Sequence, residues 1–203
     1  MISAAASHYF SPVPPVASRR GAIEFRDGDR VYRFRTAPGV FSRATVDRGT
    51  RLLLDTVDVS GARHILDLGC GYGVMGIVAA GRATLARVTL VDVNPRAVAL
   101  TVENIALNRV TNAQVLCRDG WAPEADQQFD LVLFNPPIRA GRSVVLRLLR
   151  EAHASLGAGG RVYLVARTQQ GARTLGRLMG EIYESVAEVA RGGGFRVFEG
   201  RRV

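Results

Sequence analysis

A glycine-rich turn that follows a predicted apolar strand constrains the fold of this chain more than any other sequence feature. Residues 65–77 read Ile-Leu-Asp-Leu-Gly-Cys-Gly-Tyr-Gly-Val-Met-Gly-Ile. Gly69, Gly71 and Gly73 let the backbone come close to a ligand, and the helix that follows exposes N–H groups at its start. The segment therefore predicts a strand, a ligand-binding turn and a helix in succession.

The chain around this turn alternates between strands and helices. Continuous apolar runs such as Val88–Val91 are typical of strands buried on both faces of a parallel sheet. Asn94 followed by Pro95 predicts the start of one helix, and Ser143 that of another. Strands are expected near 63–68, 87–92, 113–117, 129–134 and 161–167, and further helices near 47–57 and 171–182. This order indicates a doubly wound α/β sheet.

Both ends of the chain are expected to add antiparallel structure. Residues 11–18 are proline-rich and predict an extended arm, and residues 23–34 predict a hairpin that turns at Asp27-Gly28. Strands near 185–190 and 195–199, joined by three glycines, predict a second antiparallel pair. We divide the chain into an arm with a hairpin, residues 1–36, and one domain, residues 37–203.

The charge of the chain is positive and unevenly distributed. The 203 residues carry 27 basic side chains, all arginine, and 18 acids, which gives a net charge of +9. Residues 136–203 hold twelve arginines and five acids, or +7, whereas residues 61–135 hold six and seven, or −1. A basic face favours a polyanion such as RNA or DNA. On charge alone, a merely solubilising role explains the arginines equally well.

Composition excludes several classes of protein. The chain has no run of about 18 apolar residues, so no membrane-spanning helix and no membrane partner are expected. Two cysteines cannot build a disulfide framework, which favours a reducing, cytoplasmic location. The three histidines and two cysteines lack the spacing of metal ligands, so no metal site is expected.

The acid inside the first strand bears on the ligand. Gly71, Gly73 and Gly76 match the dinucleotide fingerprint G-x-G-x-x-G, a weak signal when taken alone. Asp67 would repel the phosphates of NAD, whereas it suits the ammonium and sulfonium groups of S-adenosylmethionine. The sequence therefore favours S-adenosylmethionine, with a tight turn that holds no ligand as the alternative.

Two further acids follow predicted strands. Asp92 ends the second strand, where a carboxylate can accept hydrogen bonds from both ribose hydroxyls of a nucleoside. Asp119 comes after the third strand and could accept from the adenine amino group. A helix cap or loop role is the alternative for Asp92, and surface placement is the alternative for Asp119.

An Asn-Pro-Pro sequence ends the fourth predicted strand. Its two prolines stop the strand and restrict the backbone. At the carboxyl edge of the sheet, the Asn135 side chain and the Pro136 carbonyl would be acceptors beside the nucleoside. Such acceptors can hold an exocyclic base amine so that its lone pair faces a methyl donor, which is catalysis by alignment and electrostatics. A simple strand-ending turn is the alternative.

Together these motifs resemble class I S-adenosylmethionine-dependent methyltransferases. Within that class the chain is similar to the small methyltransferase-domain (MTS) group, which includes ribosomal RNA guanine-N2 methyltransferases, over roughly residues 35–200. The likeness rests on Pro38–Ser42 with Asp47–Thr50, Asp67–Gly73, Val91–Val98 with Asn104 and Asn108, and Asn135–Pro137 with Gly141. The order and spacing of these four stretches are more specific than any one of them.

The resemblance implies a Rossmann-like, doubly wound, seven-stranded sheet whose last strand is antiparallel. It implies S-adenosyl-L-methionine as cofactor and RNA, either ribosomal RNA or a ribosomal subunit, as partner. The cofactor-binding residues that it implies are Phe41, Asp47, Asp67, Gly69, Cys70, Gly71, Asp92, Val93, Asp119, Gly120 and Asn135. The catalytic residues that it implies are Asn135, Pro136 and Pro137.

Two departures from the family pattern bear on the substrate. Relatives that methylate base amines usually have an aromatic residue after Asn-Pro-Pro, where this chain has Ile138. The larger bacterial ribosomal enzymes also carry an additional N-terminal domain, so here the hairpin, the arm and the basic C-terminal third are expected to bind RNA. Methylation of a protein glutamine amide and a non-catalytic, cofactor-binding RNA module remain alternatives, and an NAD-dependent oxidoreductase is least favoured.

Three other side chains have local interpretations. Cys70 could act as a nucleophile in a pyrimidine methyltransferase, but its place in the glycine turn favours packing. Trp121 is expected either to line an adenine pocket or to belong to the core. Arg139 and Arg142 flank the Asn-Pro-Pro turn and would either contact phosphates or remain solvated.

Overall fold

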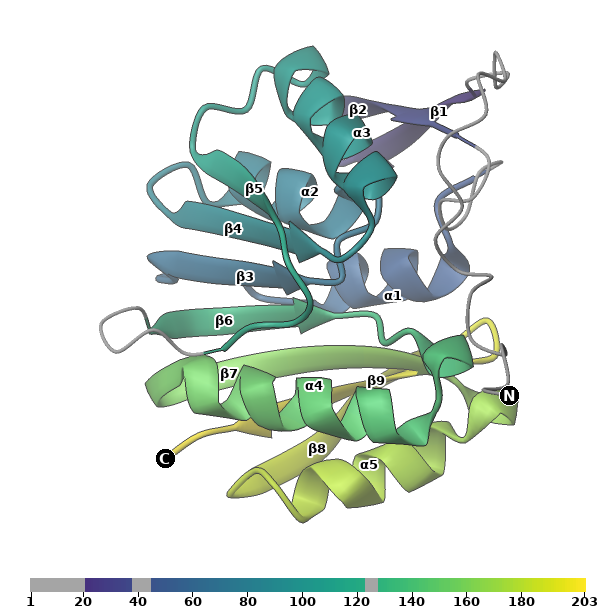
Figure 1. Ribbon diagram of the computed structural model, residues 1–203, viewed down its shortest axis with the longest axis vertical. Helices are drawn as coiled ribbons and strands as arrows, with labels where there is room; N and C mark the ends of the chain where they lie inside the picture. The colour runs from purple at the N-terminus through teal and green to yellow at the C-terminus, as the bar shows by residue number, and fades with distance from the viewer. Residues whose placement is uncertain (1–20, 38–44, 123–127) are drawn as a thin grey trace, which may run out of the picture.

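A seven-stranded sheet forms the centre of the molecule (Figure 1). The computed structural model describes residues 21–37, 45–122 and 128–203. The strands are β3 (His64–Leu68), β4 (Arg87–Asp92), β5 (Ala113–Cys117), β6 (Phe129–Phe134), β7 (Leu156–Arg167), β8 (Ser185–Gly192) and β9 (Phe195–Arg201). Their order in the sheet is β5-β4-β3-β6-β7-β9-β8, and β9 runs antiparallel to both of its neighbours. The predicted fold class, with its antiparallel last strand, is confirmed.

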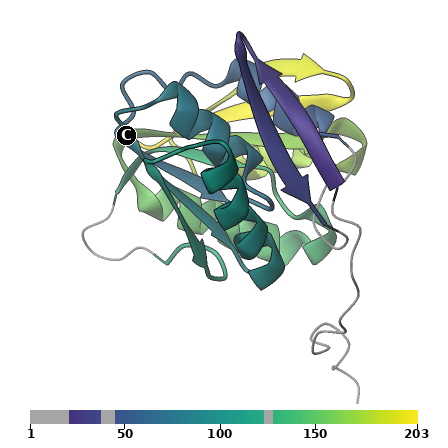
Figure 2. The same ribbon diagram turned by 90° about the horizontal axis from the view of Figure 1, so that it is seen from above.

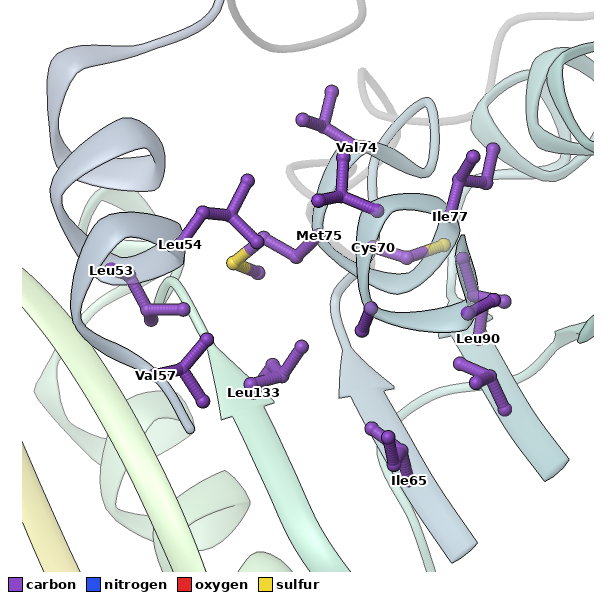
Figure 3. Packing of buried hydrophobic residues seen from close by; sticks show 14 of the residues in the cluster. Leu53, Leu54, Val57, Ile65, Cys70, Val74, Met75, Ile77, Leu90 and Leu133 are labelled. Atoms are coloured by element: carbon purple, nitrogen blue, oxygen red, sulfur yellow. The ribbon is translucent and has the colours of Figure 1, made fainter. Parts of the chain in front are cut away.

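Helices cover both faces of this sheet. One face carries α1 (Arg48–Thr56), α2 (Val74–Arg82) and α3 (Pro95–Leu107), and the other α4 (Arg142–Ser155) and α5 (Ala172–Gly180). Each central strand serves both layers, because alternate side chains point to opposite faces. In β3, for example, Ile65 joins the first core and Leu66 the second. Figure 3 shows Leu54 of α1 and Met75 of α2 packed above the strands in the first core.

The helix starts agree with the sequence at one position and differ at another. Asn94 caps α3 as predicted, since its side chain accepts the N–H of Arg96 at 3.0 Å, with Pro95 next to it. The prediction that Ser143 caps α4 is wrong. The helix begins after Gly141, which has a φ of 99° and accepts the N–H of Val145 at 3.2 Å. A short 3₁₀ turn, Ile138–Ala140, leads into this glycine, so the helix starts earlier in the sequence than predicted.

Strand β7 is longer than the sequence indicated. It begins at Leu156 rather than near residue 161, because its glycine-rich first part forms backbone hydrogen bonds with the C-terminal segment of the same chain. Gly159 donates its N–H to the carbonyl of Arg202 at 2.8 Å, and Arg202 donates to the carbonyl of Gly160 at 3.0 Å. Local glycine content predicts a loop, whereas the tertiary partner makes this segment a strand.

The predicted N-terminal hairpin is present as β1 (Gly21–Asp27) and β2 (Arg30–Thr36). It lies beside α3 and α2, as Figure 2 shows from above. Residues 1–20 are outside the described part, so the division of the chain at residue 36 stays a prediction. In the described residues, no helix has the length and apolar character needed to cross a membrane.

Two asparagines on α3 attach the hairpin to the domain. The Asn104 amide accepts the N–H of Arg35 at 2.7 Å and donates to its carbonyl at 3.1 Å. The Asn108 amide does the same for Arg33, at 2.9 and 2.7 Å. Residues four apart on a helix thus face residues two apart on a strand. Each amide makes the two backbone hydrogen bonds that a neighbouring strand would otherwise make. Asn104 also donates to the carbonyl of Tyr72 at 2.9 Å, which connects the hairpin to the glycine turn.

An ion pair holds the other end of the hairpin. Both carboxylate oxygens of Asp27 accept hydrogen bonds from the Arg82 guanidinium, at 2.6 and 2.9 Å. Arg82 is the last residue of α2 and also donates to the carbonyl of Leu54 in α1. The bidentate hydrogen bond keeps the pKa of Asp27 below its usual value.

Candidate active site

A cavity of about 820 Å³ lies at the carboxyl ends of the parallel strands. This is the edge where open α/β sheets bind ligands, and the volume is within the range of ligand pockets. The predicted residues that line it are Asp47, Gly69, Cys70, Gly71, Asp92, Val93, Asp119, Gly120, Asn135, Pro136 and Pro137. Asp67 lies beneath its surface, and Phe41 is outside the described residues. The structure thus brings the dispersed motifs to one place.

The glycine turn is held tightly against β4. Gly69 and Cys70 each donate their N–H to the carbonyl of Val91 at 2.9 Å. Gly71 has a φ of 59° and Gly73 a φ of 93°, conformations that other residues adopt only with strain. A side chain at Gly73 would also lie 2.9 Å from Thr101. The turn therefore needs glycine both for its path and for its contact with α3.

Asp67 is a fully buried acid beneath this turn. Its Oδ2 accepts the N–H of Gly76 at 2.7 Å, whereas its Oδ1 has no hydrogen-bond partner among the described residues. Burial is the main cause that raises the pKa of Asp67 to about 7. The negative charge of Asp92 adds to the rise, and the Gly76 hydrogen bond opposes it. A buried acceptor without a partner is costly, so this oxygen suits a bound cation or a water held by one.

Asp92 links the glycine turn to the next loop. Its Oδ2 accepts the N–H of Gly71 and its Oδ1 that of Asn94, both at 2.8 Å. Burial raises the pKa of Asp92, and the two backbone hydrogen bonds oppose that rise. The bonds fix the carboxylate at the wall of the cavity, where its remaining lone pairs can accept from a ligand.

The loop after β5 is fixed from the opposite face of the sheet. Asp119 accepts a hydrogen bond from Arg147 of α4 at 2.7 Å, and its side chain is 64% exposed. Arg147 also pairs with Glu151 at 2.8 Å, and Glu151 accepts the N–H of Trp121 at 2.9 Å. Trp121 packs edge-on against Phe129 in the core and does not line the cavity. Of its two predicted roles, the core role is the one observed.

Asn135 follows β6 and presents an oriented amide to the cavity. Its Nδ2 donates to the Thr50 hydroxyl at 3.1 Å, and its Oδ1 accepts no hydrogen bond from the described residues. The Pro136 carbonyl accepts the N–H of Ile138 at 2.9 Å and keeps a second lone pair. The turn thus carries two acceptor oxygens with a restricted backbone between them.

Thr50, Arg167 and Phe195 are among the cavity residues that the sequence did not assign to the site. Gly49 allows α1 to lie against Phe195, because a Cβ there would be 2.6 Å from the ring. The Arg167 guanidinium lies 5.0 Å from the centre of the same ring. Asp47 caps α1 through hydrogen bonds to Gly49 and Thr50, a pattern that could have indicated Thr50. Arg167 ends the predicted strand 161–167, a position that could have indicated it, whereas Phe195 carries no comparable local signal.

The Cys70 side chain is built into the turn. It is 8% exposed, and its sulfur lies 3.8 Å from the Thr101 hydroxyl. Burial raises the pKa of the thiol well above its ordinary value, with added repulsion from the charges of Asp67 and Asp92. A protonated thiol is a poor nucleophile, so packing explains this residue better than covalent catalysis.

Comparison with known families identifies the class of protein. Residues 31–199 match the family described as the methyltransferase small domain. The chain belongs to this family. It is an S-adenosylmethionine-dependent methyltransferase, and the prediction of class and cofactor is confirmed.

Relatives of this methyltransferase include an uncharacterized protein and named ribosomal enzymes. YbxB of Bacillus subtilis, uncharacterized, is 34% identical over 97% of this chain and 98% of its own length. Ribosomal RNA small subunit methyltransferase C of Pseudomonas putida is 36% identical over 74% of this chain and 46% of its own length. The chain thus spans about half the length of the methyltransferase C relatives that it matches.

A solved structure supports both the fold and the cofactor of this methyltransferase. The 16S rRNA N2 methyltransferase RsmC of T. thermophilus, in complex with AdoMet and guanosine, aligns with a TM-score of 0.81 at 27% identity. The alignment covers 94% of this chain and 52% of RsmC. A crystal structure of a methyltransferase from Pyrococcus furiosus, 21% identical with a TM-score of 0.62, shares the fold.

The residues of the cavity fit S-adenosylmethionine. The glycine turn gives close access to the backbone, and the Asp92 carboxylate lines the wall beside it, with Arg118 and Asp119 further along. The unpartnered Oδ1 of Asp67 beneath the turn suits a cationic ligand end. A pyrophosphate would meet repulsion from the same carboxylates.

Proposed function

We propose that this methyltransferase methylates an exocyclic amine of an RNA base, and that guanine-N2 of ribosomal RNA is its target. The main support is the Asn135 amide, whose Nδ2 is occupied by Thr50 and whose Oδ1 is left for a substrate. Relatives named ribosomal RNA small subunit methyltransferase C, and RsmC bound to guanosine, support the choice of base and RNA.

In this proposal the chain acts by holding the amine. The Asn135 Oδ1 and the second lone pair of the Pro136 carbonyl accept the two N–H groups of the target nitrogen. These bonds orient the nitrogen lone pair and offset the positive charge that develops there. The cofactor, when bound, supplies an activated methyl group. After transfer the nitrogen releases its extra proton to water, so no strong base is needed.

Cofactor binding is assigned to the glycine side of the cavity. The Asp67 carboxylate and the turn at Gly69–Gly71 would hold the methionine end. The oriented carboxylate of Asp92 would accept from the ribose hydroxyls, with Val93 beside it. Asp119 and Gly120 would hold the adenine, and Asp47 with Phe41 would lie near the cofactor. These roles are proposals that extend the family resemblance to single residues.

The target base needs a face to stack on, and Ile138 offers only an aliphatic one. Arg167 lines the same cavity, and its guanidinium lies over the ring of Phe195. Flat guanidinium groups stack on bases in RNA-binding proteins. We assign to Arg167 the stacking contact that an aromatic residue after Asn-Pro-Pro would otherwise make.

An alternative substrate is a protein glutamine amide, and Ile138 is the observation that favours it. A primary amide also presents two N–H groups to the same acceptors, and it needs no stacking surface. The two substrates differ in the polymer that carries the methyl group, which makes them easy to separate.

The deciding experiment incubates the purified protein with radiolabelled S-adenosylmethionine and either total ribosomal RNA or ribosomal proteins. We expect a product that ribonuclease releases and protease does not. Labelling of protein alone would refute the RNA assignment. If neither polymer is labelled while calorimetry shows binding of S-adenosylhomocysteine, the chain is a non-catalytic binding module. Binding of NAD in the same titration would contradict the cofactor.

A further inference from the structure

A second, shallower groove of about 510 Å³ lies between α5 and β8. Its charged residues are Arg173 and Arg177 of α5, Arg191 of β8, Arg196 of β9 and Glu188 of β8. We call this set the arginine groove. Four arginines and one glutamate give it a formal charge of +3. Figure 1 shows α5 and β8 together at one edge of the molecule.

Glycines keep this groove open. Gly176 brings α5 close to β9, because a Cβ there would lie 2.6 Å from the Phe198 ring. Gly180, one helical turn further, has no heavy atom within 4 Å of the place where a Cβ would be. Both glycines line the groove together with Val186 and Phe198, and neither glycine adds a side chain that would fill it. An extended polymer can therefore approach the guanidinium groups.

The four arginines form two pairs with different roles. Arg191 and Arg196 are both held by Glu188, at 2.7 and 2.5 Å, and this pairing lowers the pKa of Glu188. Arg196 is only 5% exposed, and its Nε has no partner among the described residues. Arg173 and Arg177 are exposed, and the described residues offer them no hydrogen bond or ion pair. They lie one helical turn apart, so their guanidinium groups can act together.

The arginine groove and the active-site cavity reach the same end of the sheet, near the start of α5 and of β9. Gln170 lines the cavity, and Arg173 follows three residues later on the first turn of α5. Phe195, at the start of β9, also lines the cavity, and the next residue, Arg196, lies in the groove on the opposite face of the sheet and pairs with Arg191 across the strands. A polymer with one unit in the cavity can therefore reach the groove by passing around this end of β9.

We propose that the arginine groove binds the phosphate backbone of RNA next to the nucleotide that enters the active site. The inference rests on the proposed function and names the surface that holds the substrate. Unpaired arginines form bidentate hydrogen bonds with phosphates, and the fixed pair supplies positive charge at the floor. Glu188 does not oppose this, because its charge is balanced by the two arginines that it holds.

The test compares two double variants with the same change in charge. R173E/R177E alters the exposed pair of the groove. R63E/R87E is the matched control, because both residues are exposed at the amino ends of β3 and β4, opposite the cavity. RNA affinity is measured by fluorescence anisotropy of a labelled ribosomal RNA fragment over a series of salt concentrations. Calorimetry with S-adenosylhomocysteine reports whether the cofactor site remains intact.

We expect R173E/R177E to bind RNA at least about tenfold more weakly. The slope of log affinity against log salt concentration should become shallower by the amount expected for the loss of about two phosphate contacts. R63E/R87E should stay within about threefold of the unaltered protein, and R173K/R177K should retain most of the affinity because it keeps the charge. Equal losses in both glutamate variants would overturn the groove and leave the proposed function standing.

Two further outcomes would overturn the inference in other ways. If the unaltered protein binds and methylates no RNA, the proposed function fails, and the groove fails with it. If R173E/R177E impairs binding of an acidic protein but not of RNA, the surface exists and its assigned partner is wrong.

Discussion

The two halves of the sheet meet at one cavity but are built from different chemistry. In the first half, made of β3, β4 and β5, backbone N–H groups hold one oxygen of the buried Asp67 and both oxygens of Asp92. In the second half, made of β6, β7, β9 and β8, the Asn135 amide and Arg167 line the cavity and four arginines line the groove. The first half suits a small cationic cofactor, and the second suits an anionic polymer.

The charge of the sequence follows the same division. Residues 61–135 carry −1 and residues 136–203 carry +7, and β6 lies at the boundary between them. The cofactor can be held by turn geometry and a few acids. The proposed RNA substrate would call for longer-range attraction, which exposed arginines provide. Variants in one half should therefore leave the function of the other half intact.

The largest effect is expected in the second half, at Asn135. Asn135→Ala removes the acceptor that orients the amine, so we expect kcat to fall by about 10²- to 10³-fold. Affinity for S-adenosylhomocysteine, measured by calorimetry, should change by less than about threefold, as expected for an interaction made in the transition state. Asn108→Ala, which alters an amide on the hairpin side, is the control. Similar kcat losses in both variants would show that Asn135 acts through stability alone.

In the first half, Asp67 should make cofactor binding depend on pH. Because burial raises its pKa to about 7, the cofactor-free protein binds a proton that the unfolded chain loses near pH 3.8. The free energy of unfolding therefore falls as the pH rises from the unfolded-state pKa of 3.8 to the folded-state pKa of about 7. A cationic ligand favours the carboxylate, so affinity should rise over the same range, by up to about tenfold per unit.

Asp67→Asn should remove the contribution of Asp67 to both pH effects and leave only the smaller one of Asp92, as measured by thermal unfolding and by calorimetry with S-adenosylmethionine between about pH 5 and 8. RNA binding should not change, because Asp67 lies under the glycine turn and away from the arginine groove. A pH-independent affinity in the unaltered protein would contradict the role assigned to this carboxyl.

Asn104 tests how the hairpin supports the first half. Asn104→Ala leaves backbone groups of Arg35 and Tyr72 without their partner, which should cost about 2 to 3 kcal/mol in the free energy of unfolding. Asn108→Ala lies nearer the surface and should cost about 1 kcal/mol. Urea denaturation measures both values. Equal costs would mean that the bond to Tyr72 contributes nothing.

The smallest effect on catalysis is expected at Thr50, which acts through Asn135. Thr50→Val keeps the shape but removes the oxygen that accepts from the Asn135 Nδ2, so the amide can turn. We expect kcat to fall by about tenfold with little change in KM for either substrate. Thr50→Ser restores the hydroxyl and should recover most of the rate. Failure of serine to rescue the rate would show that the methyl group, not the hydroxyl, matters at this position.

The sequence predicts the central strands well because their apolar runs are unambiguous. The limits of β4, β5 and β6 agree with the predicted ranges to the residue. Predictions fail where a distant partner overrides a local signal. The glycines of β7 look like a loop until the C-terminal residues pair with them, and Ser143 looks like a cap until a 3₁₀ turn ends at Gly141.

The same distinction applies to the site. Asp92, Asp119 and Asn135 could be placed together, because the carboxyl ends of parallel strands share one edge. Arg167 ends the predicted strand 161–167 and could have been placed by the same rule. Phe195 could not, because its position follows from the insertion of β9 between β7 and β8. Placing Thr50 in the site would have required knowing how α1 packs against the sheet.

The attachment of the hairpin has a consequence for how the cofactor is released. Tyr72, just before α2, is fixed through Asn104, and Arg82, at the end of α2, is fixed by Asp27. The hairpin is therefore bonded near both ends of α2, the helix whose first turn lines the cavity proposed to hold the cofactor. The hairpin contributes no strand to the central sheet, yet its contacts restrain α2. Removing these contacts should let the first turn of α2 move more freely and shorten the residence time of the cofactor.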